Sequence, residues 1–476
     1  MLFNSFPFLI FFPLVTLLYY ILPYRFRWVH LLIASCVFYM FFIPAYIFIL
    51  IVTIIIDYTA GIYIEKTKGG RRRNWLILSI ISTCLVLFVF KYFNFFSLNF
   101  EKIAELFHLN YPVGFVNIIL PVGLSFHTFQ SLSYVIEVYR GNQKAEKHLG
   151  IYSLYVMFYP QLVAGPIERP QNMLHQFYEK HDFSYTNMVE GLKLMLWGFF
   201  KKVVVADRLS IYVNAVYNNP EHHTGTSLAL ATIFFTFQIY CDFSGYSDIA
   251  IGSARTMGFK LMTNFNRPYF SKSISEFWKR WHISLSTWFR DYLYIPMGGN
   301  RVSKPRWLLN LFVTFVVSGL WHGANWTYVF WGAFNGGYLV FPHLLNTSSK
   351  KKSYSNNRLL KNSSTIVKVG ITFFLTCFAW IFFRANSISE SFEIIQRIFY
   401  NHGPLFIGDG RTILYGVTFL FFLLCVETVQ EYRLLNNFSL FHHPNRKVRF
   451  ATYICLSLII LLFGVFDGGQ FIYFQF

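Results

Sequence analysis

A histidine and two tryptophans interrupt an otherwise apolar stretch that runs from Arg306 to Phe341. They lie in Ser318-Gly-Leu-Trp-His-Gly-Ala-Asn-Trp326. An ionisable side chain at membrane depth is costly unless it faces a partner or a wet cavity, so His322 is a candidate for chemistry. A neutral imidazole can accept the proton of a hydroxyl that attacks an acyl carbon. The alternative is a histidine held by a hydrogen bond between packed helices.

Groups that could stabilise the oxyanion of such a reaction lie beside His322. Trp321 and Asn325 are suitable by residue type, as are the backbone N–H groups next to Gly323. A second histidine, His282, occurs in an earlier segment rich in tryptophan and charge. Two such histidines, one beside a basic face, suit acyl transfer from a charged thioester. Metal binding is the structural rival, and we expect no metal because a third ligand in a tight motif is missing.

The composition defines the class of protein. Of the 476 residues, 55% are hydrophobic and 21% aromatic, while only 13% are charged. Apolar runs near the roughly 20 residues of a bilayer-spanning helix recur along the chain. We therefore predict an all-α polytopic membrane protein with a single integral-membrane domain, 1–476.

Basic residues are concentrated between the apolar runs. The chain has 41 Lys+Arg against 22 Asp+Glu, a net charge of +19. The positive-inside rule puts the most basic short loop, 65–73, on the cytoplasmic side, and both termini then lie outside. Nucleic acid is not needed to explain the charge, since no soluble basic domain is visible. A basic face would also attract an anionic metabolite such as a coenzyme A ester.

Two segments near the middle of the chain combine charged and apolar residues. Residues 187–213 carry lysines, an aspartate and an arginine, which suits an amphipathic, partly interfacial helix. Residues 226–252 form a span with two carboxylates, Asp242 and Asp248. Carboxylates in an apolar run should face the protein interior.

Residues 272–300 are too charged to cross a lipid-exposed bilayer. We expect a helix here that dips into the protein from the cytoplasmic side, with Ser275 as its N-cap and Glu276 in its first turn. Four residues at helical spacing would share one face: Trp278, Trp281, His282 and Leu285.

Five motifs follow one another along the chain: Leu120-Pro-Val-Gly-Leu-Ser-Phe-His127, Gly165-Pro-Ile-Glu-Arg-Pro170, Cys241-Asp-Phe-Ser-Gly-Tyr-Ser-Asp248, Phe277-Trp-Lys-Arg-Trp-His-Ile-Ser-Leu-Ser286 and Gly319-Leu-Trp-His-Gly-Ala-Asn-Trp326. With the terminal Phe471-Ile-Tyr-Phe-Gln-Phe476, they resemble the membrane-bound O-acyltransferase family. The bacterial branch typified by the alginate O-acetylase is the most similar. One motif alone would be weak, but five in order cover nearly the whole chain.

The resemblance implies a fold and a site. The fold would be a ring of about 11 transmembrane helices, with re-entrant and interfacial helices, around a central passage. His322 matches the family's catalytic histidine, and His282 matches a second functional position. The donor thioester would enter from the cytoplasm. The acceptor, or a partner protein that carries it, would approach from outside.

The resulting hypothesis is an O-acetyltransferase of the bacterial inner membrane, with acetyl-CoA as donor substrate and no bound cofactor. His322 would be the general base and His282 would orient groups or stabilise charge. Charge and position suggest that Lys279, Arg280 and Arg301 hold the coenzyme A phosphates. The resemblance implies an exported polysaccharide as acceptor, alginate among others, and a periplasmic SGNH-type acetyltransferase or esterase as partner.

Three other functions are weighed against this hypothesis. One is the transfer of D-alanine to teichoic acid within the same family. Another is a transporter without chemistry, because broken helices and intramembrane histidines also suit transporters. The third is a scaffold for a periplasmic enzyme, which would not require His322.

Overall fold

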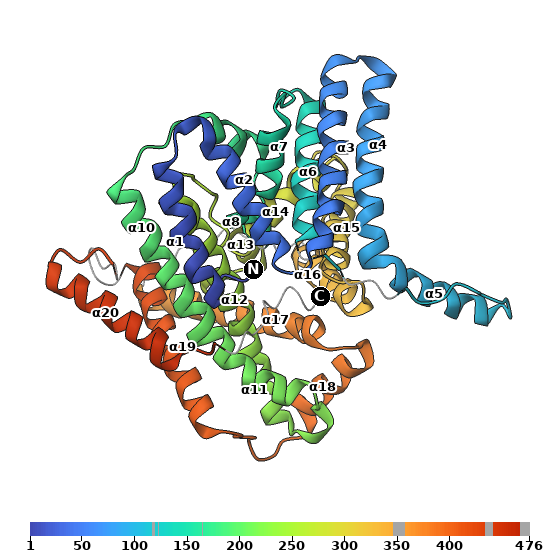
Figure 1. The fold of residues 1–476 in the computed structure, drawn as a ribbon. Helices are drawn as coiled ribbons and strands as arrows, with labels where there is room; N and C mark the ends of the chain where they lie inside the picture. The colour runs from blue at the N-terminus through green and yellow to red at the C-terminus, as the bar shows by residue number, and fades with distance from the viewer. Residues whose placement is uncertain (117–119, 122, 164, 346–357, 434–440, 467–476) are drawn as a thin grey trace. The chain divides into compact units, whose positions relative to one another are not determined.

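The computed structural model describes residues 1–116, 120–121, 123–163, 165–345, 358–433 and 441–466, with the backbone alone for 358–363. Every regular element in these ranges is helical, which confirms the predicted all-α class (Figure 1). The chain divides into two compact units, Met1–Leu194 with Ile249–Met262 and Met195–Asp248 with Thr263–Phe476. Helices α10 (Tyr185–Phe199) and α12 (Gly225–Thr256) contribute residues to both.

Among its described residues, the first unit contains nine further helices: α1 (Phe6–Ile21), α2 (Tyr24–Met40), α3 (Ile47–Lys66), α4 (Gly69–Leu87), α5 (Phe93–Leu106), α6 (Leu124–Arg140), α7 (Leu149–Met157), α8 (Tyr159–Leu162) and α9 (Pro170–Met173). Three shorter segments connect some of them: the 3₁₀ turns η1 (Pro44–Tyr46) and η3 (Leu174–Tyr178), and the π-helical η2 (Phe88–Tyr92). Helices α3, α4 and α6 pack against one another.

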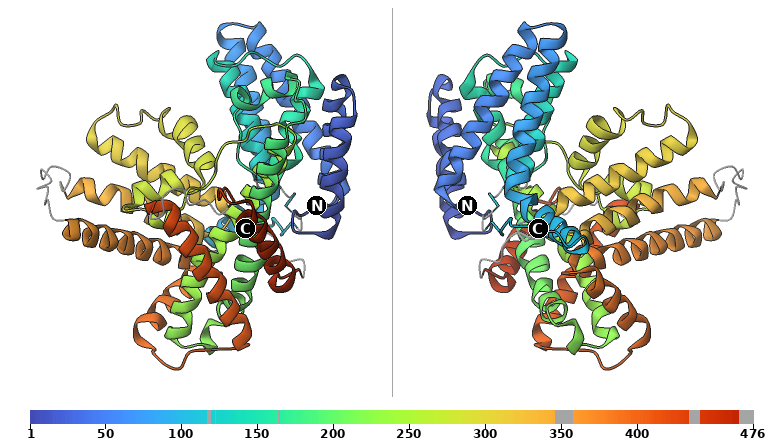
Figure 2. Two further views of the ribbon diagram at one scale, coloured as in Figure 1. Left: turned by 90° about the vertical axis from the view of Figure 1, so that its left-hand side faces the viewer. Right: turned by 90° about the vertical axis from the view of Figure 1, so that its right-hand side faces the viewer.

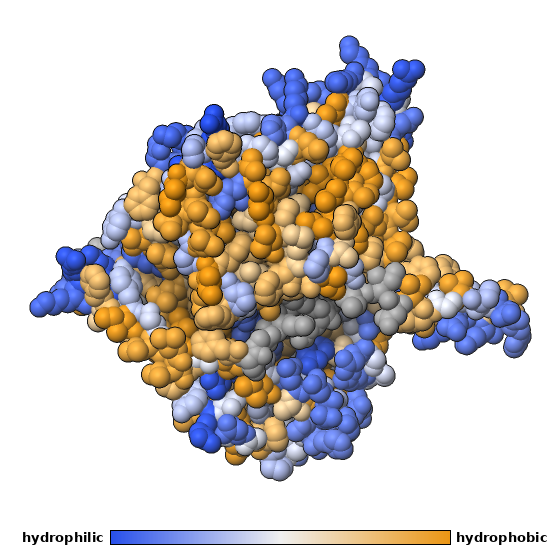
Figure 3. Space-filling model, viewed as in Figure 1, coloured by the Kyte–Doolittle hydropathy of each residue, from blue (hydrophilic) through white to orange (hydrophobic). Residues whose placement is uncertain are grey.

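Helices α3 and α4 form a hairpin with a polar contact inside it. Asp57 on α3 is buried and accepts hydrogen bonds from Ser79 (2.5 Å) and Thr83 (3.1 Å) on α4. A buried carboxyl group needs such donors. The predicted basic loop, 65–73, includes the turn of this hairpin, and Figure 3 shows a hydrophilic tip beyond the apolar sides of the two helices.

Five helical segments of the described chain are long and apolar enough to cross a membrane: Pro44–Lys66, Gly69–Leu106, Gly225–Thr256, Ser364–Arg384 and Gly410–Tyr432. Helix α1 is apolar but shorter. Large apolar side chains such as Ile81 on α4 and Phe421 on α19 (Gly410–Tyr432) are exposed, as lipid-facing residues would be. The number of spans, about 11, stays a prediction.

The second unit contains the remaining elements: the π-helical η4 (Phe200–Ala206), α11 (Asp207–Tyr217), the 3₁₀ turns η5 (Pro220–His222) and η6 (Pro268–Phe270), α13 (Ile274–Arg280), α14 (Ile283–Phe289), the π-helical η7 (Arg290–Tyr294), α15 (Lys304–His322), α16 (Trp326–Leu344), α17 (Arg358–Arg384), α18 (Ile388–Tyr400), α19 and α20 (Arg446–Phe463). Figure 2 shows α15, α16 and α17 side by side, in yellow to orange.

Helices α15 and α16 pack at a backbone-to-backbone contact formed by glycines. A Cβ atom on Gly319 would lie 2.2 Å from the carbonyl oxygen of Tyr328 and 3.1 Å from the Cα of Gly332. A Cβ atom on Gly332 would lie 2.3 Å from the carbonyl oxygen of Phe315. Any side chain at either glycine would push the helices apart, so the missing Cβ atoms fix the distance between α15 and α16.

A buried cluster of charges joins η4 to α12. The ammonium group of Lys202 lies 2.7 Å from carboxylate oxygens of both Asp207 and Asp242, and that of Lys201 lies 2.5 Å from Asp248. The prediction that Asp242 and Asp248 face the interior is confirmed. Lys201 and Lys202 belong to the segment expected to be amphipathic and partly interfacial, and both lysines are buried against these carboxylates.

Candidate functional site

His322 is the last residue of α15, which ends where Gly323 and Asn325 in the sequence predict a break in the helix. Gly323 is extended, with φ −160° and ψ 150°. A Cβ atom at this glycine would lie 2.1 Å from the ring of Tyr328. Asn325 then starts α16 as its N-cap, because its side chain accepts the N–H of Thr327 at 3.1 Å. The break therefore places His322 at the connection between two packed helices.

Aromatic rings surround the buried imidazole of His322, which is only 4% exposed. Its ring centroid lies 4.8 Å from Trp321, 5.0 Å from Trp331 and 5.4 Å from Phe383, each in an edge-on arrangement. Edge-on contacts of this kind fix the plane of a ring. The surroundings exclude bulk water, which strengthens any electrostatic interaction with a reacting group.

His282 lies in the turn between α13 and α14 and is fully buried. Its ring packs edge-on against Phe243 at 4.6 Å and parallel to Phe265 at 6.3 Å. The ring centroid of Trp321 lies 6.5 Å from that of His282. Since Trp321 also contacts His322, the structure brings both predicted histidines to the same indole ring.

The prediction of a single helix within residues 272–300 is wrong, because two short helices, α13 and α14, occupy this segment. Helix α13 ends at Arg280, and His282 has a left-handed backbone, with φ 42° and ψ 55°. The N-cap of α13 is Ser273 rather than Ser275, and its hydroxyl accepts the N–H of Glu276 at 3.2 Å. Glu276 does lie in the first turn, as predicted.

Asn325 was predicted as a possible oxyanion or substrate contact. Its side-chain oxygen caps α16, and its side-chain nitrogen donates to the carbonyl of Asn386 at 3.0 Å. Both ends of the amide are therefore used in holding the α15–α16 connection and the start of α18. The preference of asparagine for the N-cap position would have predicted this role from sequence.

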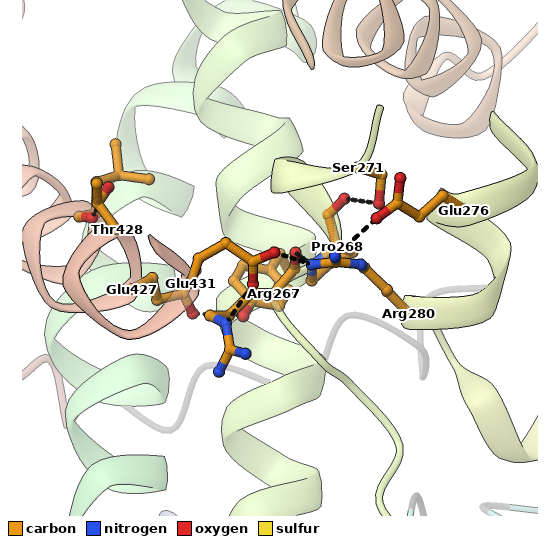
Figure 4. A network of polar contacts seen from close by, with 10 residues as sticks. Arg267, Pro268, Ser271, Glu276, Arg280, Glu427, Thr428 and Glu431 are labelled. Carbon is orange, nitrogen blue, oxygen red and sulfur yellow. Dashed lines mark hydrogen bonds and ion pairs between the residues drawn. The ribbon is translucent and has the colours of Figure 1, made fainter. Parts of the chain in front are cut away.

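The three predicted phosphate contacts have different environments. Arg280 is held between two carboxylates, at 2.7 Å from Glu276 and 2.8 Å from Glu431. Glu431 also pairs with Arg267 at 2.9 Å, so one carboxylate bridges two guanidinium groups (Figure 4). Arg301 is exposed in the turn before α15, and Lys279 lines a cavity.

This cavity has a volume of about 510 Å³ and is lined by residues of α13, α14, η7, α15 and α16. Lys279 and Arg290 bring positive charge to it, while Thr314 and Ser318 of α15 face it with hydroxyl groups. Ser318 precedes His322 by one helical turn, which corresponds to about 5–6 Å between Cβ atoms. A second cavity of about 580 Å³ shares several of the lining residues, Tyr294 and Leu311 among them.

A polar stripe along α15 leads to His322, and the sequence interpretation missed it. Asn310, Thr314, Ser318 and His322 follow one another at four-residue steps, and all four are buried. Residues four apart share a face of a helix. The pattern was present in the sequence, where it could have marked the face of α15 that lines the cavity.

Two residues from the other motifs stabilise the first unit. His127 is buried, and its Nε2 lies 3.2 Å from the hydroxyl of Thr53, a contact between packed helices. Glu168 is buried and accepts a hydrogen bond from the backbone N–H of Met262. Among the described residues, no group of three or more His, Cys, Asp or Glu side chains could hold a metal ion.

Known proteins share this chain's sequence over most of its length. The chain is 39% identical over 404 residues to the "Probable alginate O-acetylase AlgI" of Pseudomonas aeruginosa, covering 84% of this chain and 75% of that protein. It is 31% identical over 496 residues to the "Peptidoglycan O-acetyltransferase" of Helicobacter pylori, covering 94% and 91%. The "Teichoic acid D-alanyltransferase" of Bacillus subtilis is 28% identical over 284 residues, covering 57% and 70%.

A family model described as "MBOAT, membrane-bound O-acyltransferase family" matches residues 148–384, which include both site histidines. The motif-based resemblance is thereby confirmed, and so are the predicted O-acyltransferase class and the integral-membrane character. This chain is a member of the membrane-bound O-acyltransferase family.

Proposed function

We propose that this protein transfers acetyl groups from acetyl-CoA to an exported polysaccharide, directly or through a periplasmic partner. The observation that carries the proposal is the position of His322. It ends the polar face of a helix that lines a cavity, and it shares Trp321 with His282. Relatives named for alginate and peptidoglycan O-acetylation cover more of this chain than the relative named for D-alanyl transfer.

His322 is proposed as the general base. As an acceptor hydroxyl attacks the thioester carbonyl carbon, its proton passes to the imidazole. The carbon–sulfur bond then breaks, and the coenzyme A thiolate takes that proton, so that His322 returns to its neutral form. The indole N–H of Trp321 is a candidate donor to the developing oxyanion, and His282 is proposed to orient groups or stabilise charge.

The cavity is proposed to hold the thioester end of the donor. Ser318 and Thr314 lie on the wall that continues to His322, and Lys279 would attract the phosphates, whereas the neighbouring Arg290 already pairs with Asp291 at 2.7 Å. The carboxylates around Arg280 already satisfy its charge, which supports Lys279 over Arg280 as a phosphate contact. Arg301, which is exposed in the turn before α15, is proposed as a further contact for the phosphates.

We place the protein in the bacterial inner membrane, with the 65–73 loop in the cytoplasm and the N-terminus outside. The basic composition of that loop supports this orientation. The C-terminus is proposed to lie outside as well, and residues 467–476 fall beyond the described part of the chain. Acetyl-CoA would then reach the site from the cytoplasm, and the acceptor or an SGNH-type partner from the periplasm.

Donor identity can be tested with purified protein in nanodiscs. Radiolabelled acetyl-CoA is supplied in one reaction and a D-alanyl carrier-protein thioester in another, and thioester cleavage is followed. We expect cleavage of acetyl-CoA only. Cleavage of the D-alanyl thioester alone would replace the proposal by D-alanyl transfer.

The same assay tests the cavity as the donor site. Lys279→Ala should raise KM for acetyl-CoA about tenfold with little change in kcat, because a hydrogen bond to a charged group contributes about 1.5 kcal/mol. Lys260→Ala, which removes an exposed lysine, is the matched control and should leave KM unchanged. Equal KM values for the two variants would exclude Lys279 from donor binding.

A further inference from the structure

The backbone of His282 has a conformation that an L-residue rarely adopts. Its φ of 42° and ψ of 55° lie in the left-handed region, where Cβ crowds the following carbonyl. Such residues persist where surrounding contacts determine them, and they occur often at functional sites. The direction of the His282 ring therefore depends on the contacts that hold this one turn.

Asn264 makes most of these contacts on one side of the turn. Its backbone carbonyl accepts the N–H of Ile283 at 2.9 Å. Its side-chain oxygen accepts both the N–H (3.2 Å) and the hydroxyl (2.9 Å) of Ser284. Its side-chain nitrogen donates to the hydroxyl of Ser247 on α12 at 3.2 Å. The fully buried Asn264 thus ties both residues after His282 to α12, Ile283 through its backbone carbonyl and Ser284 through its side-chain amide.

The residues before His282 are held by the continuation of the same segment. The N–H of Asn266 donates to the carbonyl of Arg280 at 2.9 Å. Glu431 then joins Arg267 to Arg280 through their guanidinium groups, as Figure 4 shows. Residues 264–267 therefore run along the α13–α14 turn and fix it on both sides of His282.

We propose that Asn264 is the positioning residue for His282: it holds the left-handed turn that directs the imidazole toward Trp321. Asparagine suits the position because its amide supplies an acceptor for Ser284 and a donor for Ser247 at once. The kinetic consequence rests on the proposed function of His282. The structural consequence is that substitutions at residues 264 and 282 have coupled effects on stability, and it does not depend on the proposed function.

The kinetic test compares Asn264→Ala, His282→Ala and the double variant. A positioning role predicts that Asn264→Ala lowers kcat by about 10- to 100-fold with KM for acetyl-CoA unchanged, the scale of loss for a misplaced group. In the His282→Ala background the same change should lower kcat less than twofold further. Asn264→Asp, which keeps the acceptor for Ser284, should recover part of the loss. If the loss of kcat in the double variant equals the product of the losses in the two single variants, the proposal is overturned.

The structural test uses thermal unfolding in detergent. Asn264→Ala should lower the melting temperature less in a His282→Gly background than in wild type, because glycine adopts positive φ without strain. Asn310→Ala is the control: this buried asparagine donates to the carbonyls of Met297 and Gly299 instead, so its effect should be the same in both backgrounds.

The two tests separate the two hypotheses. If His282→Ala retains full turnover, the chemical role of His282 is refuted, while the melting temperatures still decide whether Asn264 holds the turn. An equal destabilisation by Asn264→Ala in both backgrounds would refute the positioning role. If Asn264→Ala does not fold, Asn264→Asp replaces it in the same comparison, with the same expected coupling.

Discussion

The contact between α15 and α16 gives a sharp prediction for Gly319→Ala. Alanine favours a helix interior by about 1 kcal/mol over glycine, so helix propensity alone predicts a more stable protein. The structure predicts the opposite. The new Cβ atom would lie 2.2 Å from the carbonyl oxygen of Tyr328 and 3.1 Å from Gly332, and neither is the end of a flexible side chain.

The size of the effect follows from these distances. Real Cβ contacts do not fall below 3.0 Å, so the two backbones must separate locally by at least about 0.8 Å. Overpacking of this kind costs about 1–3 kcal/mol. His322 follows Gly319 by less than one turn on α15, so it moves with the helix. A displacement near 1 Å can lower a rate about 100-fold.

Thioester cleavage in nanodiscs measures the loss, and Gly337→Ala provides the control. Gly337 lies on α16 with nothing within 4 Å of an added Cβ atom, so its replacement should leave kcat unchanged. We expect Gly319→Ala to lower kcat between 10- and 100-fold. Wild-type turnover and stability in Gly319→Ala would refute the claim that this contact positions His322.

Two further predictions concern buried charges. Lys202→Met should lower the free energy of unfolding by about 3–5 kcal/mol, because Asp207 and Asp242 would lose their buried cation. Chemical denaturation measures this free energy. The control variant Lys180→Met, at an exposed lysine, should leave it unchanged, and an equal loss in Lys202→Met and Lys180→Met would contradict the role of burial. Burial raises the pKa of Glu168 from its ordinary 4.5 to about 7, so stability should be lost as pH rises between these values. Glu168→Gln should make the melting temperature depend less on pH between pH 5 and 8. An unchanged pH dependence would show that Glu168 is not its source.

The local pattern of the sequence was sufficient for the helical class and for the break at His322. Apolar runs near the length of a span predict membrane helices, and the Gly323–Asn325 pair predicts the end of α15. The interior position of Asp242 also followed from its apolar neighbours. Each of these inferences depends only on residues close together in the chain.

The remaining features depend on contacts between distant residues. The burial of Lys202 requires Asp242, which is on another helix. The split between α13 and α14 at His282 requires the amide of Asn264, since no proline or glycine marks it. Of the two carboxylates that hold Arg280, Glu276 lies four residues away at helical spacing and was visible in the sequence, whereas Glu431 lies far along the chain. Spacing within one segment does not reveal such partners.

The proposed acyl transfer depends most directly on His322, and one comparison tests this dependence. Radiolabelled acetyl-CoA is supplied to purified wild-type protein and to His322→Ala in nanodiscs. Thermal unfolding first establishes that the two proteins have the same melting temperature. Release of coenzyme A and the fate of the acetyl group are followed. We expect turnover by wild type and a loss of about 100-fold or more in the variant, because a general base contributes a factor of that size. Equal turnover by two equally folded proteins would contradict this expectation and remove His322 from the reaction.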